Sequence, residues 1–248
     1  MATEVVDPRW PKVLSLTVHE FRTPITVVAG YLRMLLKDRA GPVTDQQRRM
    51  LEEAEKSCTR LSALLSEVSE LSALEGGTAT FNRSGLNLRD VLAQCVDAVP
   101  PLPDRQIKVE LQTGNGAATV VGDATRLIAA LSSVIVAMRR EVVFNDRLIL
   151  REQVRRLDGR DVSWIAIGTE SQVQELSNAD PSRLTTFNEW RGGVGLSLAI
   201  ARRIINAHGA SIWSPKEEPK KLEETEEEVE EAKKKEPKAS AVIAIPIS

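Results

Sequence analysis

A chain of 248 residues can form one large domain or two small ones, and its apolar content of 42% is enough for a core. Its 33 basic and 35 acidic residues leave a net charge of −2, which argues against nucleic acid or an anionic membrane as a general partner. Cys58 and Cys95 have neither metal-site nor disulfide spacing, and the sequence contains no signal-peptide pattern and no apolar run of about 18 residues. We therefore expect no metal site, no membrane span and a cytoplasmic location.

Residues 14–36 are predicted to form one amphipathic helix, in which apolar side chains recur with the 3-4 spacing of a helical bundle. The predicted seam consists of Leu14, Thr17, Phe21, Pro24, Val28, Tyr31 and Leu35, widened by Val18, Ile25 and Leu32. On this register His19 lies furthest from the seam, and Thr23 is one turn later on the same exposed face. Pro24 cannot donate a hydrogen bond to the carbonyl of Glu20, so we expect the helix to bend beside an exposed histidine.

A second helix is predicted after a short connection, in which Gly41 follows the end of the first helix and Thr44 or Asp45 caps the next. Its heptad positions are Leu51, Ala54, Cys58, Leu61, Leu65 and Val68. A short connection makes the two helices antiparallel neighbours. Because a lone hairpin leaves half of its apolar stripe exposed, residues 1–76 are predicted to form a homodimeric four-helix bundle.

From residue 77 onward the pattern changes to mixed helices and strands, after a Gly-rich linker at 75–85. Helices are predicted at 86–99, 123–142 and 193–209, and strands at 106–112, 117–121, 146–157, 161–169, 210–214 and 240–248. The strands at 146–157 and 161–169 read as a hairpin. The predicted fold class is therefore α+β, with a helical hairpin followed by an α/β sandwich over 77–248.

The stretch 216–238 interrupts this second region and is almost wholly charged. It cannot bury enough apolar surface to fold alone, so it is predicted to be a solvated insertion. The alternative is a short helix with acid-to-lysine pairs that serves as a docking element.

Three motifs carry a resemblance to a known family. The sequence HEFRTP at 19–24, on the first predicted helix, resembles the H-box of two-component sensor histidine kinases. The segments VVGDATRLIAAL at 120–131 and RGGVGLSLAIARRIINAHGASIW at 191–213 resemble the ATP-binding domain of that family, in the same order. The resemblance implies a dimerisation and phosphoacceptor hairpin over 1–76 and a histidine-kinase ATPase-like domain over 77–248.

The resemblance also implies roles for three residues of the first helix. His19 would accept the phosphoryl group, since a neutral imidazole is a nucleophile near neutral pH. Glu20 would orient or deprotonate the ring, and Thr23 would position water for dephosphorylation of a partner's aspartyl phosphate. The implied partner is the receiver domain of a response regulator, as in a phosphorelay. Without the motif, an exposed histidine on a helix would read as an ordinary surface residue.

The nucleotide site departs from the family pattern in two places. Where the family has two asparagines on a long helix, the second a magnesium ligand, this sequence has Ser133 and Ala137, and Ala137 offers no oxygen to a hard cation. The aspartate that binds adenine aligns with Gly168, the paired glycines after it are absent, and Glu170 is a poorly placed substitute. Binding of ATP and magnesium is therefore predicted to be weak or absent.

A glycine loop remains at Gly192, Gly193 and Gly195, where backbone N–H groups at a helix start could hold phosphate weakly. The alternative is that these glycines only permit a tight turn, and with the adenine and metal contacts missing this reading is favoured. His208, at the end of the same helix, is predicted to cap its last carbonyls and not to be a second phosphorylation site.

Together these patterns predict a signal transduction protein of the histidine kinase family that is phosphorylated on His19 and exchanges phosphate with a response-regulator aspartate. Its ATP-dependent autokinase activity is predicted to be weak or lost. Two alternatives remain: an active ATP-dependent sensor histidine kinase with a divergent nucleotide site, and a non-catalytic dimeric scaffold.

Overall fold

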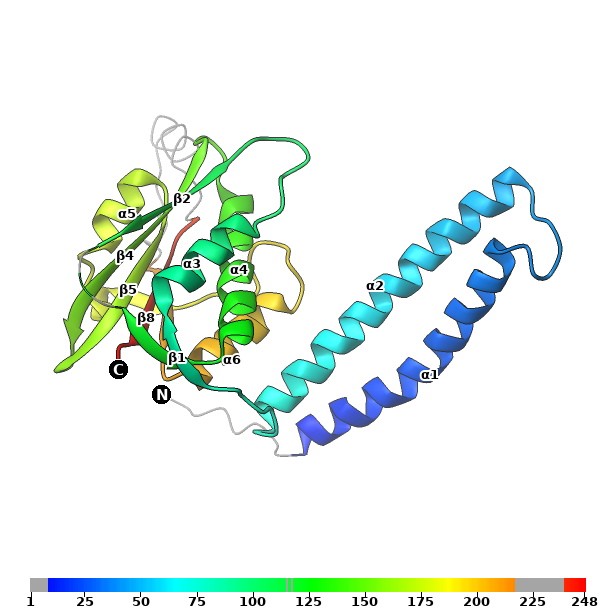
Figure 1. Cartoon of the computed structure of the whole chain (residues 1–248), viewed down its shortest axis with the longest axis horizontal. Coiled ribbons are helices and arrows are strands. Elements are labelled where there is room, and N and C mark those ends of the chain that lie inside the picture. Colours follow the sequence, from blue (N-terminus) through cyan, green and yellow to red (C-terminus); the bar gives the residue numbers. More distant parts are fainter. Residues whose placement is uncertain (1–8, 115, 117, 217–238) are drawn as a thin grey trace, which may run out of the picture. The chain divides into compact units, whose positions relative to one another are not determined.

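The computed structural model describes residues 9–114, 116, 118–216 and 239–248. Its contacts divide the chain into two compact units, Met1–Thr80 and Phe81–Ser248. The first unit is a pair of long helices and the second a mixed sheet with helices, which confirms the α+β class (Figure 1). Of the predicted charged insertion, 217–238 lies outside the described residues. Among the helices that are described, none has the length and apolarity needed to cross a bilayer.

The first unit consists of α1 (Trp10–Leu36) and α2 (Asp45–Glu75), packed side by side as the predicted antiparallel hairpin (Figure 1). The predicted seam is partly wrong for the contact within one chain. Val18 is buried, and Ile25 and Leu32, which were predicted only to widen the stripe, are half-buried. Phe21 and Tyr31, predicted seam positions, are exposed. A single partner helix covers only the half of a wide apolar stripe that faces it, so the other half remains exposed.

The end of α1 differs from the prediction that placed Gly41 directly after the helix. The helix ends at Leu36, and Asp38 adopts the left-handed conformation with φ of 54°. The N–H of Arg39 then donates to the carbonyl of Met34 at 3.0 Å, which closes the last turn in the manner of a Schellman motif. Aspartate tolerates this conformation better than most side chains, so no glycine is required at the position.

Polar side chains fix the connection between the two helices. The guanidinium of Arg48 donates to the carbonyl of Leu36 at 2.7 Å and to the carboxylate of Asp38 at 2.8 Å. At the start of α2, Thr44 and Gln47 form a capping box, in which each side chain accepts the other's backbone N–H. Of the two predicted caps, the structure therefore selects Thr44.

The second unit is built on a six-stranded sheet in the order β2-β4-β5-β8-β7-β6. Its strands are β2 (Lys108–Thr113), β4 (Arg147–Leu157), β5 (Arg160–Gly168), β6 (Leu184–Thr186), β7 (Ser211–Pro215) and β8 (Ala241–Pro246). Strand β2 runs parallel to β4 and the other neighbours are antiparallel, including the predicted β4–β5 hairpin. A separate two-stranded sheet pairs β1 (Ser84–Asn87) with β3 (Thr119–Gly122). Strand β1 spans the end of the predicted linker and the first two residues of the helix predicted at 86–99, and α3 begins only after it.

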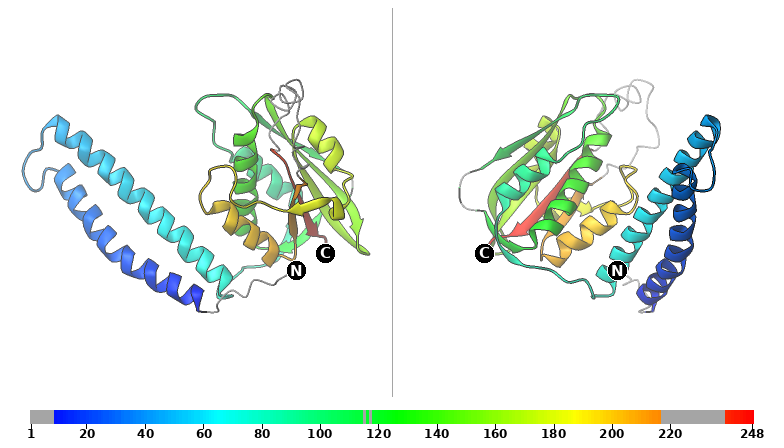
Figure 2. Two further views of the ribbon diagram at one scale, coloured as in Figure 1. Left: turned by 180° about the vertical axis from the view of Figure 1, so that it is seen from behind. Right: turned by 45° about the vertical axis from the view of Figure 1, so that its right-hand side comes forward.

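Three helices cover one face of the large sheet: α3 (Leu88–Asp97), α4 (Ala124–Glu141) and α6 (Ser197–Ala207) (Figures 1 and 2). The prediction missed α5 (Glu170–Leu176), together with the short turn η1 (Pro181–Arg183) and β6. Val173 and Leu176 of α5 pack into a buried cluster with Trp164, whose indole N–H donates to the carbonyl of Leu176 at 2.9 Å. Helix α5 thus packs on the second face of the sheet, opposite α3, α4 and α6.

Candidate functional site

His19 lies on the exposed face of α1, as predicted, with 76% of its side chain exposed. Its Nδ1 atom is 3.4 Å from a carboxylate oxygen of the neighbouring Glu20. Although adjacent helical side chains diverge, the Glu20 carboxylate therefore reaches the ring. With a proton on Nδ1 facing this carboxylate, the lone pair of Nε2 is directed to solvent.

Thr23 is exposed one turn beyond His19, on the face that the register predicted. The hydroxyls of Thr17 and Thr26, by contrast, donate back to the helix carbonyls of Val13 and Arg22, both at 2.8 Å. Helix α1 continues through Pro24. His19, Glu20 and Thr23 thus lie within two turns on one accessible surface, where a macromolecule can reach all three.

In the second unit, the glycine loop that precedes α6 packs directly on α4. Gly192, Gly193 and Gly195 all have φ between 59° and 74°. Gly192 lies so close to the buried Ala137 that a Cβ added to it would be 2.8 Å from the Ala137 Cβ. Backbone of the loop therefore packs directly beside Ala137, the position at which the resemblance implies the family's magnesium ligand.

Ion pairs hold this loop in place on both sides. Arg191 donates from Nε to both oxygens of Glu141 at 3.0 Å, so the loop is joined to the end of α4. Glu189 is buried and accepts from Arg202 at 3.0 Å and from Arg203 at 2.9 Å, which joins the loop to α6. We call these three ion pairs, Arg191–Glu141, Arg202–Glu189 and Arg203–Glu189, the loop latch.

Gly168, the position at which the resemblance implies the adenine-binding aspartate, is also closely packed. A Cβ on Gly168 would lie 2.9 Å from Oε1 of Gln172 and 3.2 Å from the Cβ of Ser240. Gln172 is held there because its side chain accepts the N–H of Thr169 at the start of α5. Glu170 accepts from Arg151 at 2.9 Å and is therefore committed to an ion pair, not free to substitute for the aspartate.

Other predicted or titratable groups near this region have structural roles. His208 is buried, and its Nδ1 is 2.7 Å from the carbonyl of Ile204, which confirms the predicted capping of α6. Its Nε2 accepts the N–H of Asp123 at 3.0 Å. The Asp123 carboxylate in turn accepts the N–H groups of Arg126 and Asn82, and these two bonds lower the pKa of its carboxyl.

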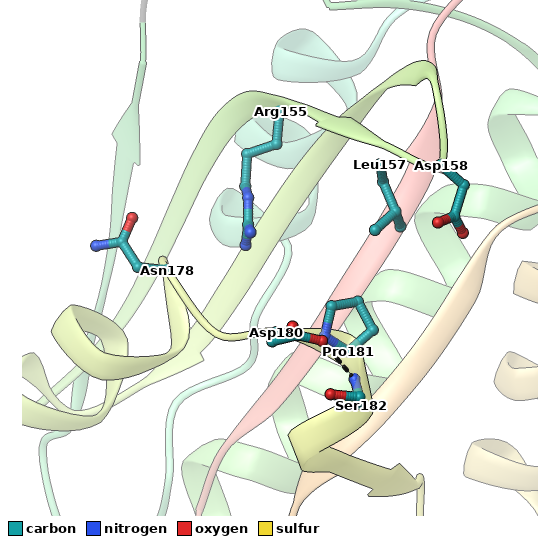
Figure 3. A pocket seen from close by; sticks show the side chains of 7 residues that line it. All are labelled: Arg155, Leu157, Asp158, Asn178, Asp180, Pro181 and Ser182. Atoms are coloured by element: carbon teal, nitrogen blue, oxygen red, sulfur yellow. Dashed lines mark hydrogen bonds between the residues drawn. The ribbon is translucent and has the colours of Figure 1, made fainter.

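A pocket of about 530 Å³ lies elsewhere, between the β4–β5 turn and the segment after α5 (Figure 3). The guanidinium of Arg155 donates to the carbonyls of Ser177 and Ala179, both at 3.1 Å. The Asp180 carboxylate accepts the N–H of Ser182, which lowers the pKa of that carboxyl. These charged groups stabilise the loop itself, and none of the lining residues is a predicted site residue. Within the described parts of the chain, no group of three or more His, Cys, Asp or Glu side chains could hold a metal ion.

Residues 12–77 match the family described as the His Kinase A (phospho-acceptor) domain. This match covers both helices of the hairpin and the exposed histidine. The hairpin is a His Kinase A phosphoacceptor domain, homologous to sensor histidine kinases. Among curated relatives, it is 28% identical over 206 residues to the circadian input-output histidine kinase CikA of Synechococcus elongatus, covering 80% of this chain and 27% of the relative. To the sensor histidine kinase GacS of Pseudomonas protegens it is 28% identical over 205 residues, or 78% of this chain and 22% of that protein.

The chain thus spans about a quarter of the length of these histidine kinases. The crystal structure of full-length ShkA in complex with AMPPNP superposes with a TM-score of 0.62 and 20% identity, over 96% of this chain and 45% of that one. At this level of identity the likeness concerns the fold alone, a hairpin of two long helices followed by a mixed sheet with helices.

Sequence reasoning missed the residues that close the second unit. The signal for α5 was present, because Thr169 followed three positions later by Gln172 is a capping-box pattern. Glu141 and Arg191 had no such signal, since they are fifty positions apart and each reads as an ordinary surface charge.

Proposed function

We propose that the chain accepts a phosphoryl group on His19 and exchanges it with an aspartate of a response-regulator receiver domain, without efficient use of ATP. The observation that carries the proposal is a contrast between the two units. The phosphoacceptor histidine is exposed, whereas Ala137 and Gly168, where the resemblance implies the magnesium ligand and the adenine anchor, are closely packed and have no polar side-chain atom.

The chemistry requires a nucleophilic nitrogen and a route for one proton. Nε2 of His19 attacks the phosphorus of an aspartyl phosphate, the N–P bond forms, and the bond from phosphorus to the aspartate oxygen breaks. Glu20, 3.4 Å from Nδ1, holds the proton on that nitrogen and stabilises the positive charge that develops on the ring. The reverse transfer uses the same groups. By family resemblance, Thr23 would orient a water molecule for hydrolysis of the partner's phosphate.

The second unit does not fit a magnesium nucleotide in the way the family uses one. Magnesium bridges and neutralises the phosphates during phosphoryl transfer, and Ala137 has no oxygen with which to hold it. Gly168 cannot accept a hydrogen bond from the adenine amino group. Each lost contact of this kind costs about 1.5–3 kcal/mol, and each 1.4 kcal/mol is tenfold in affinity. The loss of both contacts therefore supports an affinity for Mg-ATP that is weaker by several orders of magnitude.

We further propose that the chain is a homodimer through the hairpin. Phe21, Val28 and Tyr31 of α1 and Leu61 of α2 are exposed apolar side chains on the half of the stripe that the hairpin does not cover. A second copy that packs there would complete the four-helix bundle. The domain boundary proposed for this assembly falls at about residue 76, directly after α2.

The test is acid-labile labelling of the full chain, with three donors compared: labelled phosphoramidate, a phosphorylated receiver domain and labelled Mg-ATP. We expect labelling by the first two and little or none by ATP, and His19→Ala should abolish all label. Labelling by ATP within minutes at micromolar concentration would instead establish an active kinase with a divergent site. If none of the three donors labels the chain, the proposal is wrong and the non-catalytic dimeric scaffold is favoured.

A further inference from the structure

The pocket between the β4–β5 turn and the segment after α5 takes no part in the proposed phosphoryl transfer. It lies wholly within the second unit, and its volume of about 530 Å³ is in the range of small-molecule sites. None of its lining residues belongs to α4 or to the glycine loop. The lining combines one guanidinium, that of Arg155, with two carboxylates, those of Asp158 and Asp180.

Arg155 is held rigidly, yet only part of its hydrogen-bonding capacity is used. Its guanidinium lies over the ring of Trp164, with Cζ 4.3 Å from the ring centroid, and Nη1 donates to the carbonyls of Ser177 and Ala179, both at 3.1 Å. Among the described residues, Nε and Nη2 have no acceptor. These two nitrogens form the edge of a guanidinium whose parallel N–H bonds match the two oxygens of a carboxylate. Because the side chain is already fixed, it loses little freedom when a carboxylate binds.

Two carboxylates give the same pocket a negative side. Asp158 is exposed at the β4–β5 turn, and its carboxylate has no partner in the described part of the chain. The Asp180 carboxylate accepts the N–H of Ser182 at 2.8 Å, which lowers the pKa of its carboxyl and keeps it charged at neutral pH. Both carboxylates would repel a simple anion such as phosphate, and Arg155 would repel a simple cation. The charges therefore favour a ligand that carries both signs.

Apolar surface lies between the charged groups. Leu157 lies between Arg155 and Asp158, and these three side chains point from the end of β4 and its turn toward the segment that contains Pro181 (Figure 3). Leu157 also packs against the buried cluster around Trp164, so the apolar floor of the pocket is continuous with the core. A ligand that reaches both charged sides must therefore pass over apolar side chains.

We propose that this pocket binds a small zwitterion with an apolar body, the chemistry shared by apolar amino acids and short apolar peptides. The carboxylate of the ligand accepts two hydrogen bonds from Nε and Nη2 of Arg155. Its ammonium group donates to the carboxylates of Asp158 and Asp180, and its apolar part packs on Leu157 and Pro181. Hydrogen bonds between charged partners are about twice as strong as neutral ones, so they dominate the affinity.

The experiment is calorimetry on the full chain with four probes. L-leucine and the dipeptide Leu-Leu carry both charges at two different spacings, isovalerate carries only the carboxylate, and isoamylamine carries only the ammonium group. We expect a dissociation constant of about 0.1–1 mM for at least one of the two zwitterions. The two single-charge probes should bind at least about tenfold more weakly, because each lacks one set of charged hydrogen bonds.

Substitutions then test whether the binding occurs in this pocket. Asp158→Asn should weaken zwitterion binding by about tenfold or more. Asp158 has φ of 49°, a conformation that asparagine also tolerates, so this variant should keep the fold. Arg155→Lys keeps the charge but loses the paired donors, and should weaken binding similarly. Asp161→Asn, which changes an exposed carboxylate outside the lining, is the matched control and should leave binding unchanged.

Thermal unfolding of each variant checks that the fold is kept, and Asp158→Asn decides the question if Arg155→Lys is destabilised. Binding of leucine would identify a free amino acid as the ligand class, and binding of the dipeptide a short peptide. No binding of either zwitterion at about 10 mM, ten times the upper value expected, would overturn the inference. Equal affinity for either single-charge probe, or binding that is unchanged in Asp158→Asn, would overturn it too. Each of these results leaves the proposed function untouched, since His19 belongs to the other unit.

Discussion

Gly192 packs against Ala137 so closely that the Cα of Ala137 would lie 3.2 Å from a Cβ placed on the glycine. The two residues come from the glycine loop and from α4, so the loop packs on the helix at the position that aligns with the family's magnesium ligand. Gly192 also has φ of 74°, a conformation that side chains rarely adopt. We predict that Gly192→Ala lowers the free energy of unfolding by about 2–4 kcal/mol, as backbone strain and overpacking combine.

Gly193→Ala is the matched control for this substitution. Gly193 has φ of 59°, but nothing lies within 4 Å of the position of its Cβ. Only the backbone strain applies, so we expect a loss of about 1 kcal/mol. Urea unfolding followed by circular dichroism measures both variants. Equal losses in the two would mean that the loop does not press on α4.

Restoring the family's polar residues should not restore nucleotide binding. In Ala137→Asn with Gly168→Asp, the asparagine replaces a fully buried alanine beside Gly192, and a Cβ on residue 168 would lie 2.9 Å from Oε1 of Gln172 and 3.2 Å from the Cβ of Ser240. We predict a destabilised protein, by at least about 2 kcal/mol, with no gain in Mg-ATP affinity by calorimetry. Ser133→Asn, at a half-buried position one turn earlier on the same helix, should be tolerated. Micromolar Mg-ATP binding by the double variant would contradict the closed-loop interpretation.

Local sequence patterns predicted most of the helices and strands correctly. The cap predicted at Thr44 or Asp45 lies at the start of α2, and the strands predicted at 146–157 and 161–169 form the β4–β5 hairpin. The contact of Gly192 with Ala137 was not predictable, because it joins residues 55 positions apart and a glycine reveals only that its backbone is free to adopt unusual angles. For the same reason the sequence predicted weak nucleotide binding through missing ligands, but not that the loop packs against Ala137.

The heptad register illustrates a second limit. The sequence defined the full apolar stripe of α1, yet it could not divide the stripe between the partner helix of the same chain and a second copy. That division depends on the rotation of α1 about its axis, which is set by packing against α2. Val18 is buried within the hairpin, whereas the side chain of Phe21, less than one helical turn later, is 55% exposed.

This division gives a sharper test of the proposed homodimer. Phe21→Glu and Leu61→Glu introduce charge on the uncovered half of the stripe, so we predict that each raises the dimer dissociation constant by at least about 100-fold, since burying an unpaired charge costs several kcal/mol. The hairpin should remain helical. Leu16→Glu is the control: Leu16 is 64% exposed but lies about 140° round the helix from Phe21. Analytical ultracentrifugation compares them, and a wild type that is monomeric at micromolar concentration would rule out the dimer.

Asp123 makes the stability of the second unit depend on pH. Its carboxylate accepts the N–H of Arg126 at 3.1 Å and that of Asn82 at 2.8 Å, and these bonds lower the pKa of the carboxyl. A carboxyl whose pKa is lower in the folded than in the unfolded state stabilises the fold above the unfolded value of about 3.9, and this contribution is lost as the pH falls through the folded value.

Asp123→Asn can accept only one of the two bonds with its single oxygen, so it should cost about 1–2 kcal/mol at pH 7. The difference from the wild type should shrink at pH 3. Urea unfolding at the two pH values measures it, with Asp146→Asn, whose side chain is 80% exposed, as the control that should change little at either. A difference that is the same at pH 3 and pH 7 would show that the charge of Asp123 contributes nothing and that only its shape matters.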